Sequence, residues 1–160
     1  MSRVDKHNYY LDIAQAACAR STCLRRKFGA IIVQNDEIIS SGYNGAPRGR
    51  KNCIDLGTCV RKELNVPRGT RFELCRAVHA KANCIISAKR GEMLGGTLYL
   101  AGINAETGEI VDNANSCAMC KRLLINAGLD RVIVRTPNGK YDIFTIEDFI
   151  QNEEFEVEGY

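Results

Sequence analysis

The chain has 160 residues, of which 45% are hydrophobic and 26% are charged, and its formal net charge is +3 at pH 7. This length suits one domain over residues 1–160 that can bury its own core. The small net charge, with no block of like charges, argues against nucleic acid as a partner. No apolar run reaches the ~20 residues that cross a bilayer. The first residues lack the apolar core of a secretory signal, so we expect a cytoplasmic protein.

Cysteine is unusually abundant, with eight residues, whereas histidine occurs only as His7 and His79. In a reducing compartment these thiols are metal ligands, reactive groups or core residues more often than disulfides. Any zinc site in this chain must therefore depend mainly on thiolates.

The first half of the chain predicts a helix followed by a hairpin. Apolar residues at helical spacing indicate an amphipathic helix at residues 7–20. The apolar run 28–33 predicts a buried strand, and 37–43 predicts its returning partner. A loop rich in Gly, Pro and Asn follows at 42–49. Next comes a polar, irregular, cysteine-containing insertion at about 51–72.

The second half predicts alternating helices and strands. We expect a helix at 74–89 that Gly91 terminates, and a strand at 97–100. A turn at 105–109 then leads into a further strand. The predicted order continues with a helix from Cys117 to Gly128, a strand at 131–135 and a last helix capped by Thr145. This order is typical of an α/β sandwich with a mixed sheet.

Three side chains suggest a metal site with one open position. Cys117 and Cys120 are three residues apart, so both lie on one face of the predicted helix near its N-terminus, where the dipole favours thiolates. With His79 on another helix they supply three ligands, and three ligands plus water is the usual catalytic zinc arrangement. Alternatively, the cysteine pair is a redox pair or half of a structural zinc site, and His79 is an ordinary buried histidine.

Longer motifs carry a family resemblance. The segments C-R-A-V-H-A at 75–80 and C-A-M-C-K-R-L-L-I-N-A-G at 117–128 resemble the zinc-dependent cytidine and deoxycytidylate deaminase superfamily, whose pattern is H-x-E and P-C-x-x-C. The loop G-Y-N-G-A-P-R-G at 42–49 and the segment R-K-F-G-A at 26–30 are similar to the deoxycytidylate (dCMP) deaminase branch. The resemblance spans roughly residues 5–150.

This resemblance implies a three-layer, deaminase-like sandwich with a mixed sheet of about five strands flanked by helices. It implies hydrolysis of dCMP to dUMP and ammonia, with His79, Cys117 and Cys120 holding Zn²⁺. Asn44 matches the position that contacts sugar and base. Arg26 is a candidate for the 5′-phosphate, since guanidinium binds phosphate with two hydrogen bonds; alternatively it is a solvated surface charge.

Assembly and regulation also follow from the resemblance. It implies a homo-oligomer, with a hexamer favoured, that responds to dCTP as activator and dTTP as inhibitor. Mg²⁺ would accompany such triphosphate effectors. The predicted effector loop contains Gly42, Tyr43, Asn44 and Gly45, and its alternative role is a plain turn after the strand.

The signature departs from the family pattern at two positions. Ser116 replaces the usual proline before the first cysteine, which is a mild change because serine is a good N-cap. Lys81 stands where the family has its proton-shuttling glutamate. A protonated amine cannot accept a proton, so we expect turnover to fall by at least the 10²–10⁴-fold that general acid–base catalysis supplies. Glu73 lies too far along the chain to substitute.

The remaining cysteines permit a second metal site. We expect Cys23, Cys53, Cys59 and Cys75 to form a closed structural zinc site that orders the insertion. The alternative is four reduced thiols. Cys18 and Cys84 are interpreted as packing residues.

Two other functions compete with the enzyme. Lys81 favours a non-catalytic protein that binds deoxynucleotides as a sensor. A deaminase of bases within RNA or DNA is disfavoured, because the chain has no basic, aromatic stripe.

Overall fold

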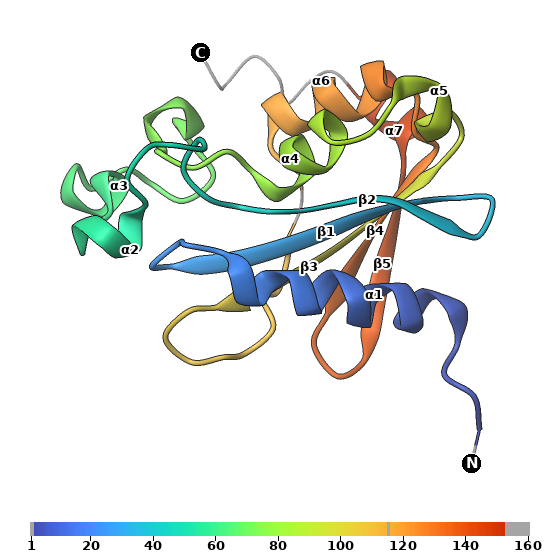
Figure 1. Cartoon of the computed structure of the whole chain (residues 1–160), viewed down its shortest axis with the longest axis horizontal. Helices are drawn as coiled ribbons and strands as arrows, with labels where there is room; N and C mark the ends of the chain where they lie inside the picture. The colour runs from blue at the N-terminus through green and yellow to red at the C-terminus, as the bar shows by residue number, and fades with distance from the viewer. Residues whose placement is uncertain (1, 115, 153–160) are drawn as a thin grey trace.

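The computed structural model describes residues 2–114 and 116–152, and its centre is a mixed sheet of five strands in the order β2-β1-β3-β4-β5 (Figure 1). The strands β3 and β4 pair in parallel, and the other neighbours pair antiparallel. The α/β class with a mixed five-stranded sheet is confirmed. The strands are β1 (Arg26–Gln34), β2 (Glu37–Tyr43), β3 (Thr97–Asn104), β4 (Arg131–Thr136) and β5 (Lys140–Thr145).

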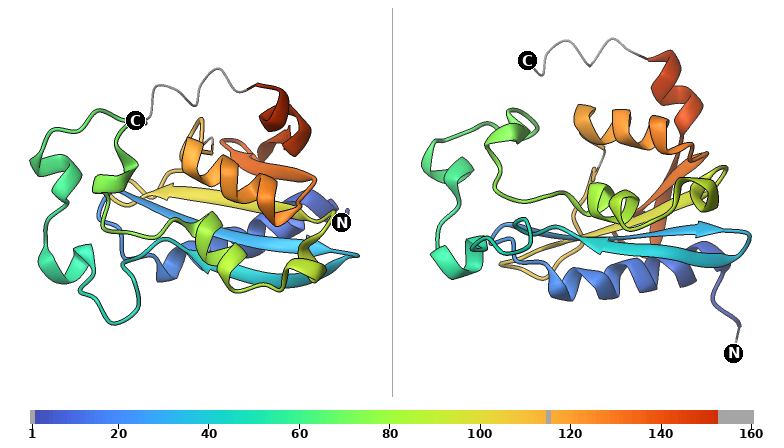
Figure 2. Two further views of the ribbon diagram at one scale, coloured as in Figure 1. Left: turned by 90° about the horizontal axis from the view of Figure 1, so that it is seen from above. Right: turned by 45° about the horizontal axis from the view of Figure 1, so that its top comes forward.

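Helices cover both faces of the sheet, which gives three layers (Figures 1 and 2). One face carries α1 (Lys6–Ala17) with the 3₁₀ turn η1 (Cys18–Arg20), and the opposite side carries α4 (Ala80–Ile86), α5 (Arg90–Met93), α6 (Ala118–Ala127) and α7 (Ile146–Gln151). The insertion forms α2 (Cys53–Leu56), α3 (Val60–Glu63) and the 3₁₀ turn η2 (Phe72–Leu74), beside the end of the sheet. No helix among the described residues is long and apolar enough to cross a membrane.

The strand β1, which lies between β2 and β3, is buried on both faces. Ile31 and Val33 belong to the core beneath α1, whereas Ala30 and Ile32 belong to the core beneath α4 and α6. A strand covered on both sides has no polar face, which explains its uninterrupted apolar run.

Helix α4 lies very close to the edge strand β2. A Cβ atom on Gly42 would lie 2.7 Å from the carbonyl oxygen of Ala80 and from the backbone nitrogen of Cys84. The hydroxyl of Ser40 donates to the carbonyl of Cys84 at 2.8 Å, and the Cys84 thiol donates to the carbonyl of Ala30 at 3.3 Å. Glycine is therefore required at residue 42, and Cys84 is a packing residue as predicted. Cys18, beneath α1, is buried too.

The helix predicted at 74–89 is wrong at both ends. Helix α4 begins at Ala80, and His79 is its extended N-cap, with φ −69° and ψ 151°. The preceding residue Val78 pairs with Gly45 through two backbone hydrogen bonds of 2.7 and 3.2 Å. These bonds hold the segment before His79 extended, so it cannot join the helix. Gly91 lies inside the separate helix α5 and terminates nothing.

The predicted strand after residue 109 is also wrong. Among residues 110–114, Ile110 alone pairs, in an isolated bridge to Ile103. The fifth strand is instead β5, which follows β4 through a turn where Asn138 and Gly139 take φ values of 66° and 70°. Asn and Gly tolerate positive φ best, so this pair was the missed turn signal. Thr145 caps α7 as predicted, since its hydroxyl accepts from the backbone N–H of Asp148 at 3.2 Å.

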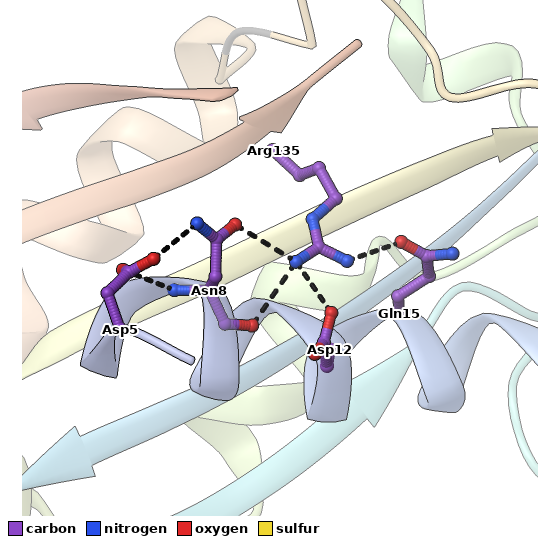
Figure 3. Close-up of polar contacts among 5 residues, drawn as sticks. All are labelled: Asp5, Asn8, Asp12, Gln15 and Arg135. Carbon is purple, nitrogen blue, oxygen red and sulfur yellow. Dashed lines mark hydrogen bonds and ion pairs between the residues drawn. The ribbon is translucent and has the colours of Figure 1, made fainter. Parts of the chain in front are cut away.

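A buried arginine ties α1 to the sheet (Figure 3). From β4, Arg135 donates to the Gln15 side chain at 2.7 Å and to the backbone and side-chain oxygens of Asn8 at 3.2 and 3.3 Å. It also pairs with the Asp12 carboxylate at 2.7 Å. Asp5 caps the same helix by accepting from the backbone N–H of Asn8 at 3.0 Å. One guanidinium therefore fixes two turns of α1.

We expect Arg135→Met to lower the free energy of unfolding by about 1–3 kcal/mol, because four contacts, one of them to a charged partner, are lost. Arg135→Lys should recover only part of this, since an ammonium lacks the planar fork. Urea unfolding monitored by circular dichroism measures both, with the exposed Arg50→Met as control. A value for Arg135→Met within about 0.5 kcal/mol of the parent would contradict the assignment.

Candidate metal centre and adjoining cavity

The structure brings the three predicted zinc ligands together. The Nδ1 atom of His79 lies 3.3 Å from the Cys120 sulfur and 3.6 Å from the Cys117 sulfur. All three donor atoms lie within 4.8 Å of one another. Tetrahedral zinc with metal–nitrogen distances of ~2.0–2.1 Å and metal–sulfur distances of ~2.3 Å requires nitrogen and sulfur about 3.6 Å apart. The two nitrogen–sulfur distances are therefore close to those of a zinc site.

Two helix N-termini create this spacing. His79 is the N-cap of α4, Cys117 is the N-cap of α6, and Cys120 is the third residue of α6. The Cys117 sulfur accepts the backbone N–H of Cys120 at 3.4 Å. Unpaired N–H groups and the helix dipole stabilise negative sulfur at such positions. The predicted convergence of two N-termini is confirmed, although His79 lies just outside its helix.

The electrostatics of this donor set favour a cation. Hydrogen bonds from Cys120 and then from His79 lower the pKa of Cys117 to about 4. Hydrogen bonds to Cys117 and Cys75 raise the pKa of His79 to about 9. The pKa of Cys120 is raised, first by its hydrogen bond to Cys117 and then by burial. A metal such as zinc, which prefers thiolate and imidazole ligands, displaces the protons that these three groups share when it binds.

A cavity of about 340 Å³ adjoins the donor set. Its lining includes His79 and Cys117, together with the predicted site residues Arg26, Asn44 and Lys81. This volume lies at the lower end of the range for small-molecule sites. The structure thus places a nucleotide-sized space beside the three ligands.

Comparison of the sequence with known proteins identifies the family. Residues 4–136 match the model of the cytidine and deoxycytidylate deaminase zinc-binding region. This chain belongs to that deaminase family. The deoxycytidylate deaminase of Mycobacterium phage D29 is 35% identical over 138 residues, which cover 83% of this chain and 96% of the phage protein. The deoxycytidylate deaminase of Schizosaccharomyces pombe is 29% identical over 81% of this chain but only 36% of its own length.

Solved structures show the same deaminase fold. The dCMP deaminase of cyanophage S-TIM5 in apo form superposes with a TM-score of 0.59 at 22% identity, covering 94% of both chains. The structure of the same cyanophage enzyme in complex with dCMP and dUMP gives 0.58 at 21% identity over 84% of both chains. The predicted three-layer deaminase fold is confirmed.

Lys81 is the second residue of α4 and only 7% of its surface is exposed. Burial lowers its pKa, while the Cys120 and Cys117 thiolates oppose that shift. Glu73 lies in η2, outside α4, where it pairs with Arg71. Among the described residues that line the cavity there is no aspartate or glutamate. The deaminase cavity therefore holds a buried amine and no carboxylate from this part of the chain.

Asn44 braces the start of β1. Its side-chain oxygen accepts from the Ser21 hydroxyl and from the backbone N–H of Phe28 at 2.8 Å. Its amide nitrogen donates to the carbonyl of Arg26 at 2.9 Å. A primary amide has two N–H donors, so one is left for a ligand. Asn44 therefore lines the cavity and also fixes the backbone of Arg26, which lines the same cavity.

The sequence did not predict a chain of side-chain contacts that connects the insertion to His79 through Arg61 and Phe72. Arg61 is 6% exposed and donates to the carbonyls of Pro67 and Arg71. Its guanidinium lies 5.1 Å from the centre of the Phe72 ring. That ring packs edge-on against the His79 ring, with centroids 5.4 Å apart. No sequence pattern distinguishes a buried arginine in a polar insertion from a solvated one.

The four thiols predicted for a second zinc lie in one neighbourhood but do not form a ready site. Burial, and then the charges of Cys23, Cys59 and Cys75, raise the pKa of Cys53. Burial is the largest single influence on Cys75 and would raise its pKa, but the hydrogen bonds to His79 and to the backbone of Ala77, with nearby positive charge, together lower the pKa. Within residues 2–114 and 116–152, His79, Cys117 and Cys120 form the one group of three or more donors close enough to share an ion.

We expect Arg61→Met to loosen the insertion, because the carbonyls of Pro67 and Arg71 lose their donor. Hydrogen–deuterium exchange should show residues 60–76 losing at least tenfold protection while β1 and β3 keep theirs, since local opening need not involve the sheet. The exposed neighbour Lys62→Met is the matched control. Unchanged exchange across 67–72 would show that Arg61 does not hold this loop.

Proposed function

We propose that this chain is a zinc-dependent dCMP deaminase that converts dCMP to dUMP and ammonia, impaired at the proton-transfer step by Lys81. The observation that carries this proposal is the cluster of His79, Cys117 and Cys120 at zinc-ligand spacing beside the cavity. The phage D29 relative, matched over 96% of its length, is a deoxycytidylate deaminase.

In this proposal Nδ1 of His79 and the thiolates of Cys117 and Cys120 hold zinc. Zinc bound there would supply Lewis acidity and make water nucleophilic near neutral pH. The free N–H of Asn44 would orient the nucleotide, and Arg26 would bind the 5′-phosphate with two hydrogen bonds.

Lys81 would limit the chemistry. Deamination needs one group that accepts a proton from water, passes that proton to the ring nitrogen, and then transfers the second proton of the water to the leaving amine. The family pattern supplies a glutamate two residues after the histidine, whereas this chain supplies a buried amine. A protonated amine has no lone pair, and a neutral amine, which burial favours, lacks the negative charge of the family's carboxylate. No described side chain of the cavity offers a carboxylate instead.

The second candidate function is non-catalytic deoxynucleotide binding, in which the same cavity serves as a sensor. Lys81 is the observation that favours it. The two functions make different predictions for a variant that restores the carboxylate.

We expect Lys81→Glu to raise the rate of dCMP deamination at least about 10²-fold, because it supplies the proton carrier. Zinc content per chain, measured by mass spectrometry of the metal, should stay constant. Lys81→Gln has similar length and no basic group, so it should show no gain. If Lys81→Glu binds zinc and dCMP yet stays inactive, the sensor function is supported instead.

We also propose a structural zinc bound by Cys23, Cys53, Cys59 and Cys75. Burial, and then the charges of Cys23, Cys59 and Cys75, raise the pKa of Cys53, and the contribution of these charges supports their proximity. A zinc ion bound by the four thiolates would order an insertion that has little apolar core. Small movements of the insertion would be needed to complete the site.

The zinc content tests this second site. The parent should hold two zinc ions per chain, and Cys53→Ser/Cys59→Ser should hold one. The reciprocal variant Cys117→Ser/Cys120→Ser should also hold one, and the combined variant none. A parent that binds a single zinc, lost only with Cys117 and Cys120, would eliminate the structural site.

Finally, we propose a cytoplasmic homo-oligomer, with a hexamer favoured, regulated by dCTP and dTTP with Mg²⁺ through the loop of Gly42, Tyr43, Asn44 and Gly45. The pairing of Gly45 with Val78 supports the loop's role. A ligand that moved this loop would move the segment that precedes His79.

A further inference from the structure

The side chain of Asn83 joins two segments that are far apart in the sequence. Asn83 is the fourth residue of α4. Its amide nitrogen donates to the carbonyl of Tyr43 at 2.8 Å and to the carbonyl of Val78 at 3.5 Å. A primary amide has two N–H donors, so both bonds can form at the same time. The end of β2 is thereby tied to the segment that precedes α4.

Each of these carbonyls belongs to the residue before a site residue. Tyr43 precedes Asn44, which lines the cavity and keeps one N–H for a ligand. Val78 precedes His79, which belongs to the group of metal donors. Asn83 therefore fixes the backbone that carries a cavity-lining amide and the backbone that carries a metal-binding imidazole.

Asn83 itself stands outside the site. It is not among the described residues that line the cavity, nor is it one of the three metal donors. Asn is a poorer helix former than Ala, because its side chain competes for backbone partners. Both bonds that the Asn83 side chain donates go to carbonyls outside α4. Asn83 can thus act on a bound ligand through Asn44 and His79.

The surrounding backbone makes these bonds possible. The backbone carbonyl carbon of Asn83 would lie 3.1 Å from a Cβ atom on Gly42, so a side chain at residue 42 would push α4 away from β2. The carbonyl of Val78 also accepts from the backbone N–H of Gly45 at 3.2 Å, and a carbonyl oxygen has two lone pairs for two such donors. A substitution cannot remove the backbone bond, but it can remove the bonds of Asn83.

Resting on the proposed function, we propose that Asn83 is a positioning residue that sets where the nucleotide lies relative to the zinc ion. It holds Asn44 in register with His79, so that the nucleotide oriented by Asn44 meets the metal. Proximity of this kind is sensitive to displacements of about 1 Å. Asn83 contributes without contact to the nucleotide or to the metal.

Isothermal titration of the zinc-loaded chain with dCMP tests this proposal. Asn83→Leu has a similar size and no N–H donor, so we expect it to bind dCMP at least about tenfold more weakly. Asn83→Gln keeps both donors and should lose less than about threefold. Zinc content should be the same in both variants, because residue 83 is not a ligand. Asn126→Leu is the matched control, since Asn126 is exposed on α6 and lies outside the cavity lining.

A double-mutant cycle separates positioning from a general loosening of α4. In an Asn44→Ala background, Asn83→Leu should weaken dCMP binding by less than about twofold further, because the side chain that it positions is gone. A purely structural role would weaken dCMP binding equally in both backgrounds, and that result would overturn the proposal.

The remaining outcomes distinguish this inference from the proposed function. If the parent binds dCMP and Asn83→Leu binds it equally well, or if Asn83→Gln loses as much as Asn83→Leu, the positioning role is wrong and the deaminase proposal stands. The same holds if Asn44→Ala binds dCMP as tightly as the parent, since Asn83 then has no nucleotide contact to position. If the zinc-loaded parent binds no dCMP, the proposed function itself fails.

Discussion

The convergence of two helix N-termini is the constraint on which this structure depends. Helices α4 and α6 begin at His79 and Cys117, and their first residues bring one imidazole and two sulfurs to zinc-ligand spacing. The close contact of α4 with Gly42 and the pairing of Val78 with Gly45 fix one start. The other start is fixed by the bond from the Cys120 backbone to the Cys117 sulfur. The sheet beneath α4 and α6 supports these two helix N-termini.

Around that point the charges are arranged unusually for a hydrolytic deaminase. The described lining carries arginines and Lys81 but no carboxylate. Under the proposed function, these cations would favour binding of an anionic nucleotide, and the lining would lack the carboxylate that carries the proton. Binding and proton transfer thus rest on different residues. In the proposed function, residue 81 is the position that decides whether this cavity catalyses deamination or only binds a nucleotide.

Sequence patterns predicted the parts of the fold that depend on local chemistry. The hairpin of β1 and β2 and the helix α6 with its Gly128 cap follow from periodicity and turn residues. The motif spacing also predicted that His79, Cys117 and Cys120 would meet. The start of α4 was not predicted, because hydrogen bonds from Gly45, far away in sequence, hold residue 78 extended. The contacts of Arg61 with Phe72 and of Phe72 with His79 were also not predictable from the sequence. Arg61 is buried because it donates to backbone carbonyls that come together only in the folded loop.

The central claim is that the three converging side chains bind zinc. The most direct measurement is an anomalous difference map at the zinc edge from crystals of the chain. The account predicts a peak ~2.0–2.1 Å from Nδ1 of His79 and ~2.3 Å from the sulfurs of Cys117 and Cys120. A map with no peak there, or a disulfide joining the two cysteines, would contradict it.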